Sequence, residues 1–163
     1  MQADLTSISW LSLAVWLPVL SGVLVLLLGG DHKATLTRWL ALAGSLVSFL
    51  VTLPLYTLFD VQDGFFQFEE LLPWVPAFNM HYHLGIDGFS MPLVLLTSFT
   101  TVIVVLAGWE VITKHIAQYM AAFLIMSGIM IGVFTALDAI LYYVFWEAML
   151  IPMFLVIGIW GGP

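Results

Sequence analysis

Glu147 is the residue of this sequence whose position most clearly suggests chemistry. It lies in an otherwise uncharged run over residues 139–160, nine residues after Asp138 and thirteen before Trp160. At a rise of about 1.5 Å per residue, a helix over this run would place the carboxyl near the middle of a membrane. A charged side chain at that depth costs about 2.5 kcal/mol or more, so we expect it to have a use.

The chemistry expected of such a carboxyl is proton exchange. Removal from water disfavours its ionised form, whereas a nearby cation favours that form, so a movable basic partner could load and unload it. Tyr143, one helical turn earlier on the same face, is a candidate hydrogen-bond partner. Pro152 has no N–H for the carbonyl of Ala148, which leaves an acceptor for water. The alternative is a structural glutamate that only fixes helix packing.

The balancing cation is not found near Glu147. Lys33, Arg38 and Lys114 are the only lysines and arginines, and all three lie at predicted membrane boundaries. The four histidines also lie outside the uncharged runs, so no pair is predicted to hold a haem, and His81-x-His83 favours an ordinary surface strand over a metal site. We therefore predict no cofactor and no metal, and we expect the basic partner to come from outside this chain.

The composition indicates the elements that would position Glu147. Of the 163 residues 63% are hydrophobic and 8% are charged, whereas soluble domains have roughly 25% charged residues. At about 20 residues per membrane span, five or six helices are possible. We predict an all-α integral membrane protein, a single transmembrane domain over 1–163 with about five transmembrane helices. The uncharged runs place these spans at 10–28, 39–59, 88–109, 116–137 and 139–160.

The loop over residues 60–87 is the one sizeable aqueous segment. Its second half alternates apolar and polar residues with the period of two that is typical of a strand, and Pro73 and Pro76 precede this alternation. We therefore predict a short β-hairpin in the outer loop between helices 2 and 3. Asp87 and Asp138, which precede the third and fifth spans, are interpreted as helix N-caps.

The distribution of charge predicts orientation and excludes one class of partner. All three basic residues lie in the first and third loops, and basic loops stay on the cytoplasmic side. The N-terminus is therefore predicted to be outside. We predict a multi-pass protein of the bacterial inner (cell) membrane, in contact with lipid. Ten acids against three bases exclude nucleic acid as a partner, because binding it requires clustered Lys and Arg.

Gly128-x-x-x-Gly132 places two small residues on one helix face and predicts a close helix contact.

Two stretches of this sequence closely resemble chain M of the proton-pumping NADH:quinone oxidoreductase. The first is FWEAMLIPM over 145–153, followed by IGIWG over 157–161, and the second is LPWVP over 72–76, leading into HLGIDGFS over 83–90. The similarity extends from about residue 70 to the end of the chain. The first two spans match only in hydropathy and length.

The resemblance implies that Glu147 corresponds to the essential fifth-helix glutamate of the family, whose charge state is coupled to lysines along a polar axis. It also implies a non-redox subunit without cofactors, which is not catalytic alone and whose partners are other membrane subunits, including sister antiporter-like chains. Family members have about fourteen helices, so this chain is incomplete at its C-terminus relative to them. A cation/proton antiporter subunit of the same fold, or a structural membrane scaffold without a proton path, remains an alternative.

Overall fold

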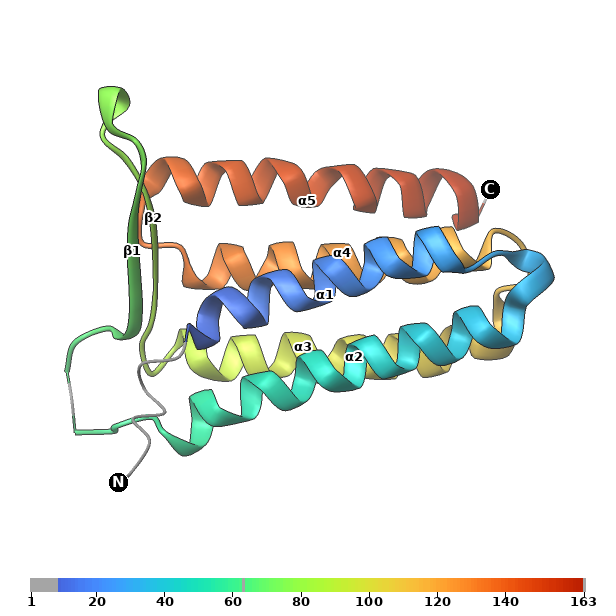
Figure 1. The fold of residues 1–163 in the computed structure, drawn as a ribbon, viewed down its shortest axis with the longest axis horizontal. Helices are drawn as coiled ribbons and strands as arrows, with labels where there is room; N and C mark the ends of the chain where they lie inside the picture. The colour runs from blue at the N-terminus through green and yellow to red at the C-terminus, as the bar shows by residue number, and fades with distance from the viewer. Residues whose placement is uncertain (1–8, 63, 163) are drawn as a thin grey trace.

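Five long helices form a bundle in the computed structural model, which describes residues 9–62 and 64–162 (Figure 1). Asp4 and Asp63 lie outside these described residues. The helices are α1 (Trp10–Leu28), α2 (Ala34–Thr57), α3 (Ser90–Val111), α4 (Ile116–Thr135) and α5 (Ala139–Trp160). Each is long and apolar enough to cross a membrane. The prediction of a helical protein with about five membrane-spanning helices is therefore confirmed.

Helix α4 lies at the centre of the bundle, where it packs against all four other helices. The two predicted small residues lie at close contacts with neighbouring helices. A Cβ built at Gly128 would collide with the carbonyl oxygen of Val15 on α1, and one built at Gly132 would lie 2.9 Å from the ring of Phe145 on α5. Because glycine has no Cβ, both neighbouring helices approach α4 closely at these positions.

A two-stranded antiparallel sheet lies across one end of the bundle (Figure 1). Strand β1 (Gln67–Val75) pairs with β2 (Met80–Ile86), and the 3-10 turn η3 (Pro76–Phe78) joins them. Asn79 follows this turn in a left-handed conformation with φ of 53°, which asparagine tolerates well. Leu84 and Ile86 of β2 are fully buried against the bundle. The predicted hairpin between helices 2 and 3 is confirmed.

The helices extend past the predicted uncharged runs at two places. Helix α2 begins at Ala34 and therefore includes Arg38. Helix α3 continues to Val111 and therefore includes Glu110. The uncharged run marks the apolar part of a span, whereas helical hydrogen bonding continues into the boundary, where charged side chains are hydrated. The 3-10 turn η2 (Asp31–Lys33) precedes α2, and the fourth helix ends at Thr135, two residues before the predicted end.

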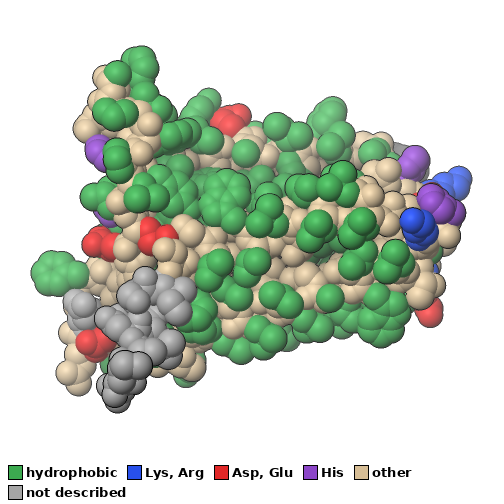
Figure 2. Space-filling model, viewed as in Figure 1, with side chains coloured by type: hydrophobic (Ala, Val, Ile, Leu, Met, Phe, Trp, Pro, Cys, Tyr) green, Lys and Arg blue, Asp and Glu red, His purple; other side chains and the backbone are tan. Residues whose placement is uncertain are grey.

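The two ends of the bundle differ in their charged side chains. Lys and Arg side chains appear only at the end opposite the hairpin, whereas hydrophobic side chains cover most of the length between the ends (Figure 2). Lys33 lies in η2, and Lys114 lies between α3 and α4, at the same end. This arrangement is what the positions of the basic residues in the sequence predicted.

Candidate functional site

Glu147 lies on the side of α5 that faces away from the bundle. The buried residues of this helix are Leu141, Phe145 and Pro152, which share one face. Glu147 is two residues after Phe145, about 200° further round a helix with 3.6 residues per turn. Its side chain is therefore exposed. We expected a buried carboxyl, but the described residues of this chain do not bury it, because α5 packs mainly on α4 and leaves its other face open.

Glu147 belongs to a stripe of exposed side chains at helical spacing along α5. It consists of Tyr143, Glu147, Leu150, Ile151 and Phe154. Glu147 lines a shallow hollow of about 420 Å³ along this stripe together with Ala148, Leu150, Ile151, Phe154 and Leu155. The hollow combines one carboxyl with apolar walls.

Tyr143 shares the outward face with Glu147, as predicted from the spacing. Its side chain is 61% exposed. Among the described residues, no hydrogen bond joins the phenol of Tyr143 to the carboxyl of Glu147, and no cation forms an ion pair with that carboxyl. The hydrogen bond between the two side chains stays a prediction.

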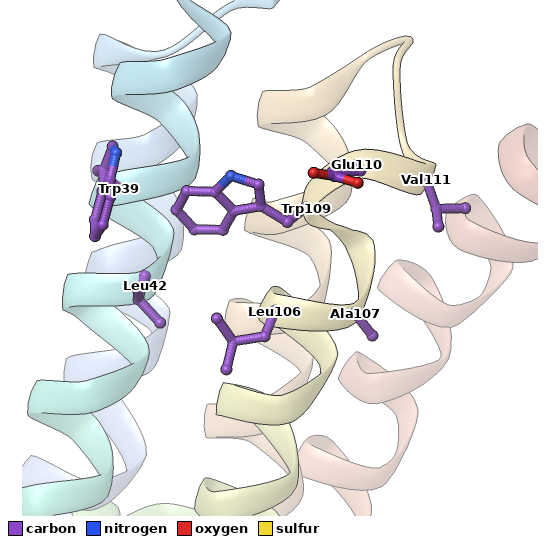
Figure 3. Close-up of a pocket in the computed structure, with 7 residues that line it drawn as sticks. All are labelled: Trp39, Leu42, Leu106, Ala107, Trp109, Glu110 and Val111. Carbon is purple, nitrogen blue, oxygen red and sulfur yellow. The ribbon is translucent and has the colours of Figure 1, made fainter.

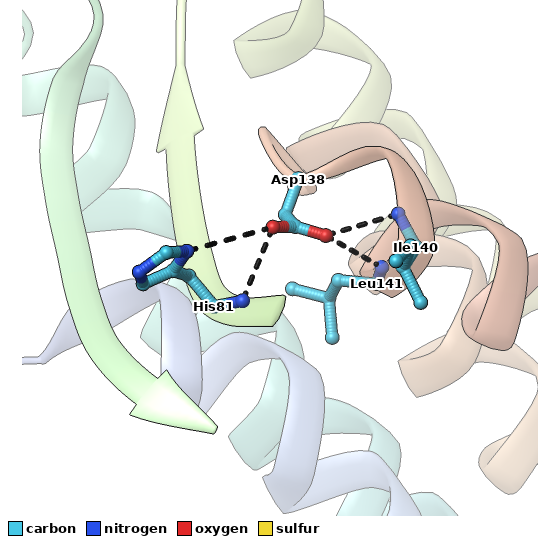
Figure 4. Close-up of polar contacts among 4 residues, drawn as sticks. All are labelled: His81, Asp138, Ile140 and Leu141. Atoms are coloured by element: carbon cyan, nitrogen blue, oxygen red, sulfur yellow. Dashed lines mark hydrogen bonds and ion pairs between the residues drawn. The ribbon is translucent and has the colours of Figure 1, made fainter. Parts of the chain in front are cut away.

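Asp138 positions the helix that bears Glu147 (Figure 4). Its Oδ1 accepts hydrogen bonds from the backbone N–H groups of Ile140 at 2.9 Å and Leu141 at 3.1 Å. These N–H groups have no partner within the helix, so the predicted N-cap is confirmed. The other oxygen, Oδ2, accepts a hydrogen bond of 3.1 Å from the backbone N–H of His81 and lies 3.9 Å from Nδ1 of its ring.

The loop between α4 and α5 is joined to the hairpin by backbone contacts as well. The N–H of Leu137 donates to the carbonyl of His83 at 2.8 Å, and Ala136 forms an isolated antiparallel bridge with Leu84. Three consecutive residues directly before α5, namely Ala136, Leu137 and Asp138, therefore contact β2. His81 and His83 pair with Asp138 and Glu69 respectively, each with a different acid.

The pKa of Asp138 is lowered by these contacts. The largest cause is the hydrogen bond from the N–H of Leu141, followed by the one from the N–H of His81, because both stabilise the ionised form. The pKa of Asp87 is lowered in the same way by the N–H of Ser90, which begins α3, although the residue directly before this helix is Phe89 and not Asp87. The two predicted caps differ in one respect, since Asp138 alone also binds the hairpin.

The sequence analysis missed a second link between the hairpin and the bundle. Glu70 of β1 accepts a 2.8 Å hydrogen bond from the N–H of Ser12 on α1, and the Ser12 hydroxyl bonds both Glu70 and, at 2.9 Å, the Tyr82 hydroxyl. Trp16 donates to the same phenol at 3.0 Å. Burial is the largest cause that raises the pKa of Tyr82. These partners are at least 58 residues apart, so no local pattern indicates them.

Asp31 is another acid whose role the sequence did not reveal. Its carboxylate accepts hydrogen bonds from the N–H groups of His115 at 3.1 Å and Ile116 at 2.9 Å, which begin α4. The cap of α4 therefore comes from η2 rather than from a residue beside the helix. Among the described residues, a carboxylate accepts a hydrogen bond from a backbone N–H group in the first turn of α1, of α4 and of α5.

Comparison with known proteins identifies relatives over most of the chain. The family model for "NADH-ubiquinone oxidoreductase chain 4, amino terminus" matches residues 24–137. The chain is 44% identical to NADH-ubiquinone oxidoreductase chain 4 of Arabidopsis thaliana, over 88% of this chain and 29% of that protein. It is 43% identical to NADH-quinone oxidoreductase subunit M of Rhodobacter capsulatus, over 93% of this chain and 30% of that protein.

A solved structure shares the fold. A chain of respiratory complex I from Thermus thermophilus with bound NADH matches with a TM-score of 0.77 and 30% sequence identity, over 94% of this chain and 30% of that chain. This chain thus spans less than a third of the length of the relatives it matches. The five apolar helices and these relatives together indicate a multi-pass membrane protein. The predicted resemblance is confirmed, and the chain belongs to the NADH-ubiquinone oxidoreductase chain 4 family, whose bacterial relatives are named subunit M.

Proposed function

We propose that this chain forms the N-terminal part of a proton-translocating membrane subunit of NADH:quinone oxidoreductase, in which Glu147 takes up and releases a proton. The observation that supports this most is a carboxyl in the middle of an apolar helix, on an outward face, without a cation among the described residues. An unpaired acid at that depth is costly unless something outside the chain covers it.

The covering partner is proposed to be a further helix with a basic residue. The exposed stripe of Tyr143, Glu147, Leu150, Ile151 and Phe154 has the spacing of a helix contact face. The matched relatives are about three times as long as this chain, so they contain additional residues that could supply such a helix. Approach of a cation would favour the ionised carboxylate, and its withdrawal would favour the protonated acid. That alternation would move one proton per cycle.

The proposed orientation follows from the two ends of the bundle. Lys33, Arg38 and Lys114 lie opposite the hairpin, and basic loops remain on the cytoplasmic side of a bacterial inner membrane. The hairpin and the start of α1 would therefore face outward. In this arrangement the links from Asp138 and Glu70 to the helices lie at the outer surface, and Glu147 lies below them within the membrane.

Replacing Glu147 with glutamine in the assembled complex tests the proposal. The amide keeps the shape of the side chain but cannot ionise, so we expect most proton translocation per electron pair to be lost. The amount of assembled complex should stay unchanged. The control is Glu69→Gln, an exposed hairpin position whose carboxylate pairs, among the described residues, with His83 alone; this variant should translocate normally. Full translocation by the Glu147→Gln complex, or loss of assembly instead of pumping, would contradict the proposal and favour a scaffold role.

A further inference from the structure

A hollow of about 520 Å³ lies between the beginning of α2 and the end of α3, at the end of the bundle opposite the hairpin (Figure 3). Its lining consists of Trp39, Leu42, Leu106, Ala107, Trp109, Glu110 and Val111. It is separate from α5 and takes no part in the proposed role of Glu147. Since α2 begins and α3 ends here, the hollow lies where the bundle meets the membrane surface.

Two tryptophans form the centre of this hollow. Their rings meet edge to face, with centroids 5.1 Å apart and planes at 82°. Both indole nitrogens point toward the end of the bundle with the connecting loops (Figure 3). Within residues 9–62 and 64–162, neither indole N–H donates to a protein acceptor. Tryptophan is enriched at membrane surfaces because its ring enters the apolar region while its N–H bonds the headgroup layer.

Glu110 places a negative charge beside these rings. It is the second-last residue of α3 and its side chain is exposed. A carboxylate in the last turn of a helix faces the negative end of the helix dipole, so a cation beside it is favoured. No lysine, arginine or histidine in the described part of the chain forms an ion pair with Glu110. The nearby guanidinium of Arg38 instead donates to the carbonyl of Ile112 at 3.2 Å.

We propose that this hollow binds a phospholipid whose headgroup has a primary ammonium, as in phosphatidylethanolamine. The ammonium would pair with the Glu110 carboxylate, and the phosphate or ester oxygens would accept from the indole N–H groups of Trp39 and Trp109. The acyl chain would begin along Leu42 and Leu106. Such a lipid offers a positive charge, hydrogen-bond acceptors and an apolar tail, one for each kind of partner in the lining of the hollow. An anionic lipid such as phosphatidylglycerol would instead place a second negative charge near Glu110.

Photocrosslinking in the intact membrane assembly that contains this chain tests the proposal. Phosphatidylethanolamine and phosphatidylglycerol with the same photoreactive acyl chain are added separately, and labelled peptides from α2 and α3 are quantified by mass spectrometry. We expect about fivefold more labelling of these peptides by the ethanolamine lipid, from the pairing of its ammonium with the exposed Glu110 carboxylate. Glu110→Gln should reduce this preference to about one.

The control is Glu69→Gln, which removes an exposed carboxylate at the opposite end of the bundle and should preserve the preference. Equal labelling by the two lipids in the unsubstituted protein, or stronger labelling by phosphatidylglycerol, would overturn the proposal. Absence of any label on these peptides would overturn it as well, since it would mean that protein covers the hollow. None of these outcomes depends on whether Glu147 exchanges protons, so this test and the pumping test can fail separately.

Discussion

Helices α4 and α5 are neighbours in the chain and nearly equal in hydropathy, yet they occupy opposite environments. Their most apolar stretches have mean hydropathies of 1.9 and 2.0. Half of that stretch is buried within the chain in α4, but only 17% of it is buried in α5. The central helix contacts its neighbours through Gly128 and Gly132, whereas α5 presents Glu147 and large apolar side chains to its surroundings.

This difference teaches that hydropathy measures compatibility with a membrane and not proximity to protein. Lipid tails are as apolar as leucine, so a helix facing lipid and a helix facing protein have similar composition. Small residues that permit close approach are characteristic of α4, whereas α5 has a carboxyl without a partner in the described part of the chain. The two features indicate that α4 is already packed within this chain and that α5 has a face available for further protein.

The largest effect is expected from adding one methyl group to the packed helix. Gly128→Ala would force α1 away, because the new Cβ overlaps the Val15 carbonyl oxygen and would lie 2.7 Å from Val19 Cγ2. Overpacking of this kind costs about 1–3 kcal/mol. The matched change, Gly158→Ala on α5, meets no atom within 4 Å and should leave stability unchanged or raise it by up to about 1 kcal/mol, because alanine favours a helix over glycine. Thermal unfolding of both variants checks this, and equal losses would abolish the distinction between the helices.

A smaller effect is expected at the start of α5. Asp138→Asn keeps one oxygen for the cap, but its amide NH2 cannot accept from the N–H of His81, so the hairpin amides of β2 should exchange hydrogen faster. Asp87→Asn is the matched change, because the side chain of Asp87 contacts Phe89 and Ser90 at the start of α3, and it should leave hairpin exchange unchanged. Hydrogen-exchange mass spectrometry distinguishes the two. Faster hairpin exchange in both variants would mean that Asp138 has no special connection to β2.

The same link should depend on pH. The pKa of Asp138 is lowered in the folded chain, so its stabilising contribution is complete above the ordinary value of 3.8 and is lost as pH falls through the lower folded value. Hairpin protection in the parent protein should therefore persist at pH 5 and decline below about pH 4. In Asp138→Asn this decline should be weaker, since the amide does not titrate. An identical pH profile in the variant would show that other carboxyls determine the decline.

The smallest effect is expected where the hairpin contacts α1, the main partner of α4. Trp16→Phe removes the 3.0 Å hydrogen bond to Tyr82 but keeps an aromatic ring, at a cost of about 0.5–1.5 kcal/mol. Ser12 still bonds both Tyr82 and Glu70, so the hairpin should remain in place. Thermal unfolding measures the loss. A cost as large as that of Gly128→Ala would mean that this hydrogen bond, rather than helix packing, dominates the contact with α1.

Much of the site could be predicted because its signals are local. The depth of Glu147 follows from the length of the uncharged run, and the cap at Asp138 follows from an acid placed directly before a helix. The hairpin follows from alternation with a period of two. The outward orientation of Glu147 could not be predicted, because α5 is apolar on all sides and its periodicity does not distinguish a protein-facing side.

The sequence by itself determined the number of helices, their approximate limits, the hairpin and the presence of one acid deep within an apolar span. These properties depend on chain length, hydrogen bonding and transfer of side chains into an apolar medium, which act residue by residue. The tertiary structure alone decided which face of α5 meets α4, that Asp138 also binds His81, and that Trp39 meets Trp109. Such pairs are far apart in the chain, and their contacts depend on the shapes of both partners, which no stretch of the sequence specifies alone.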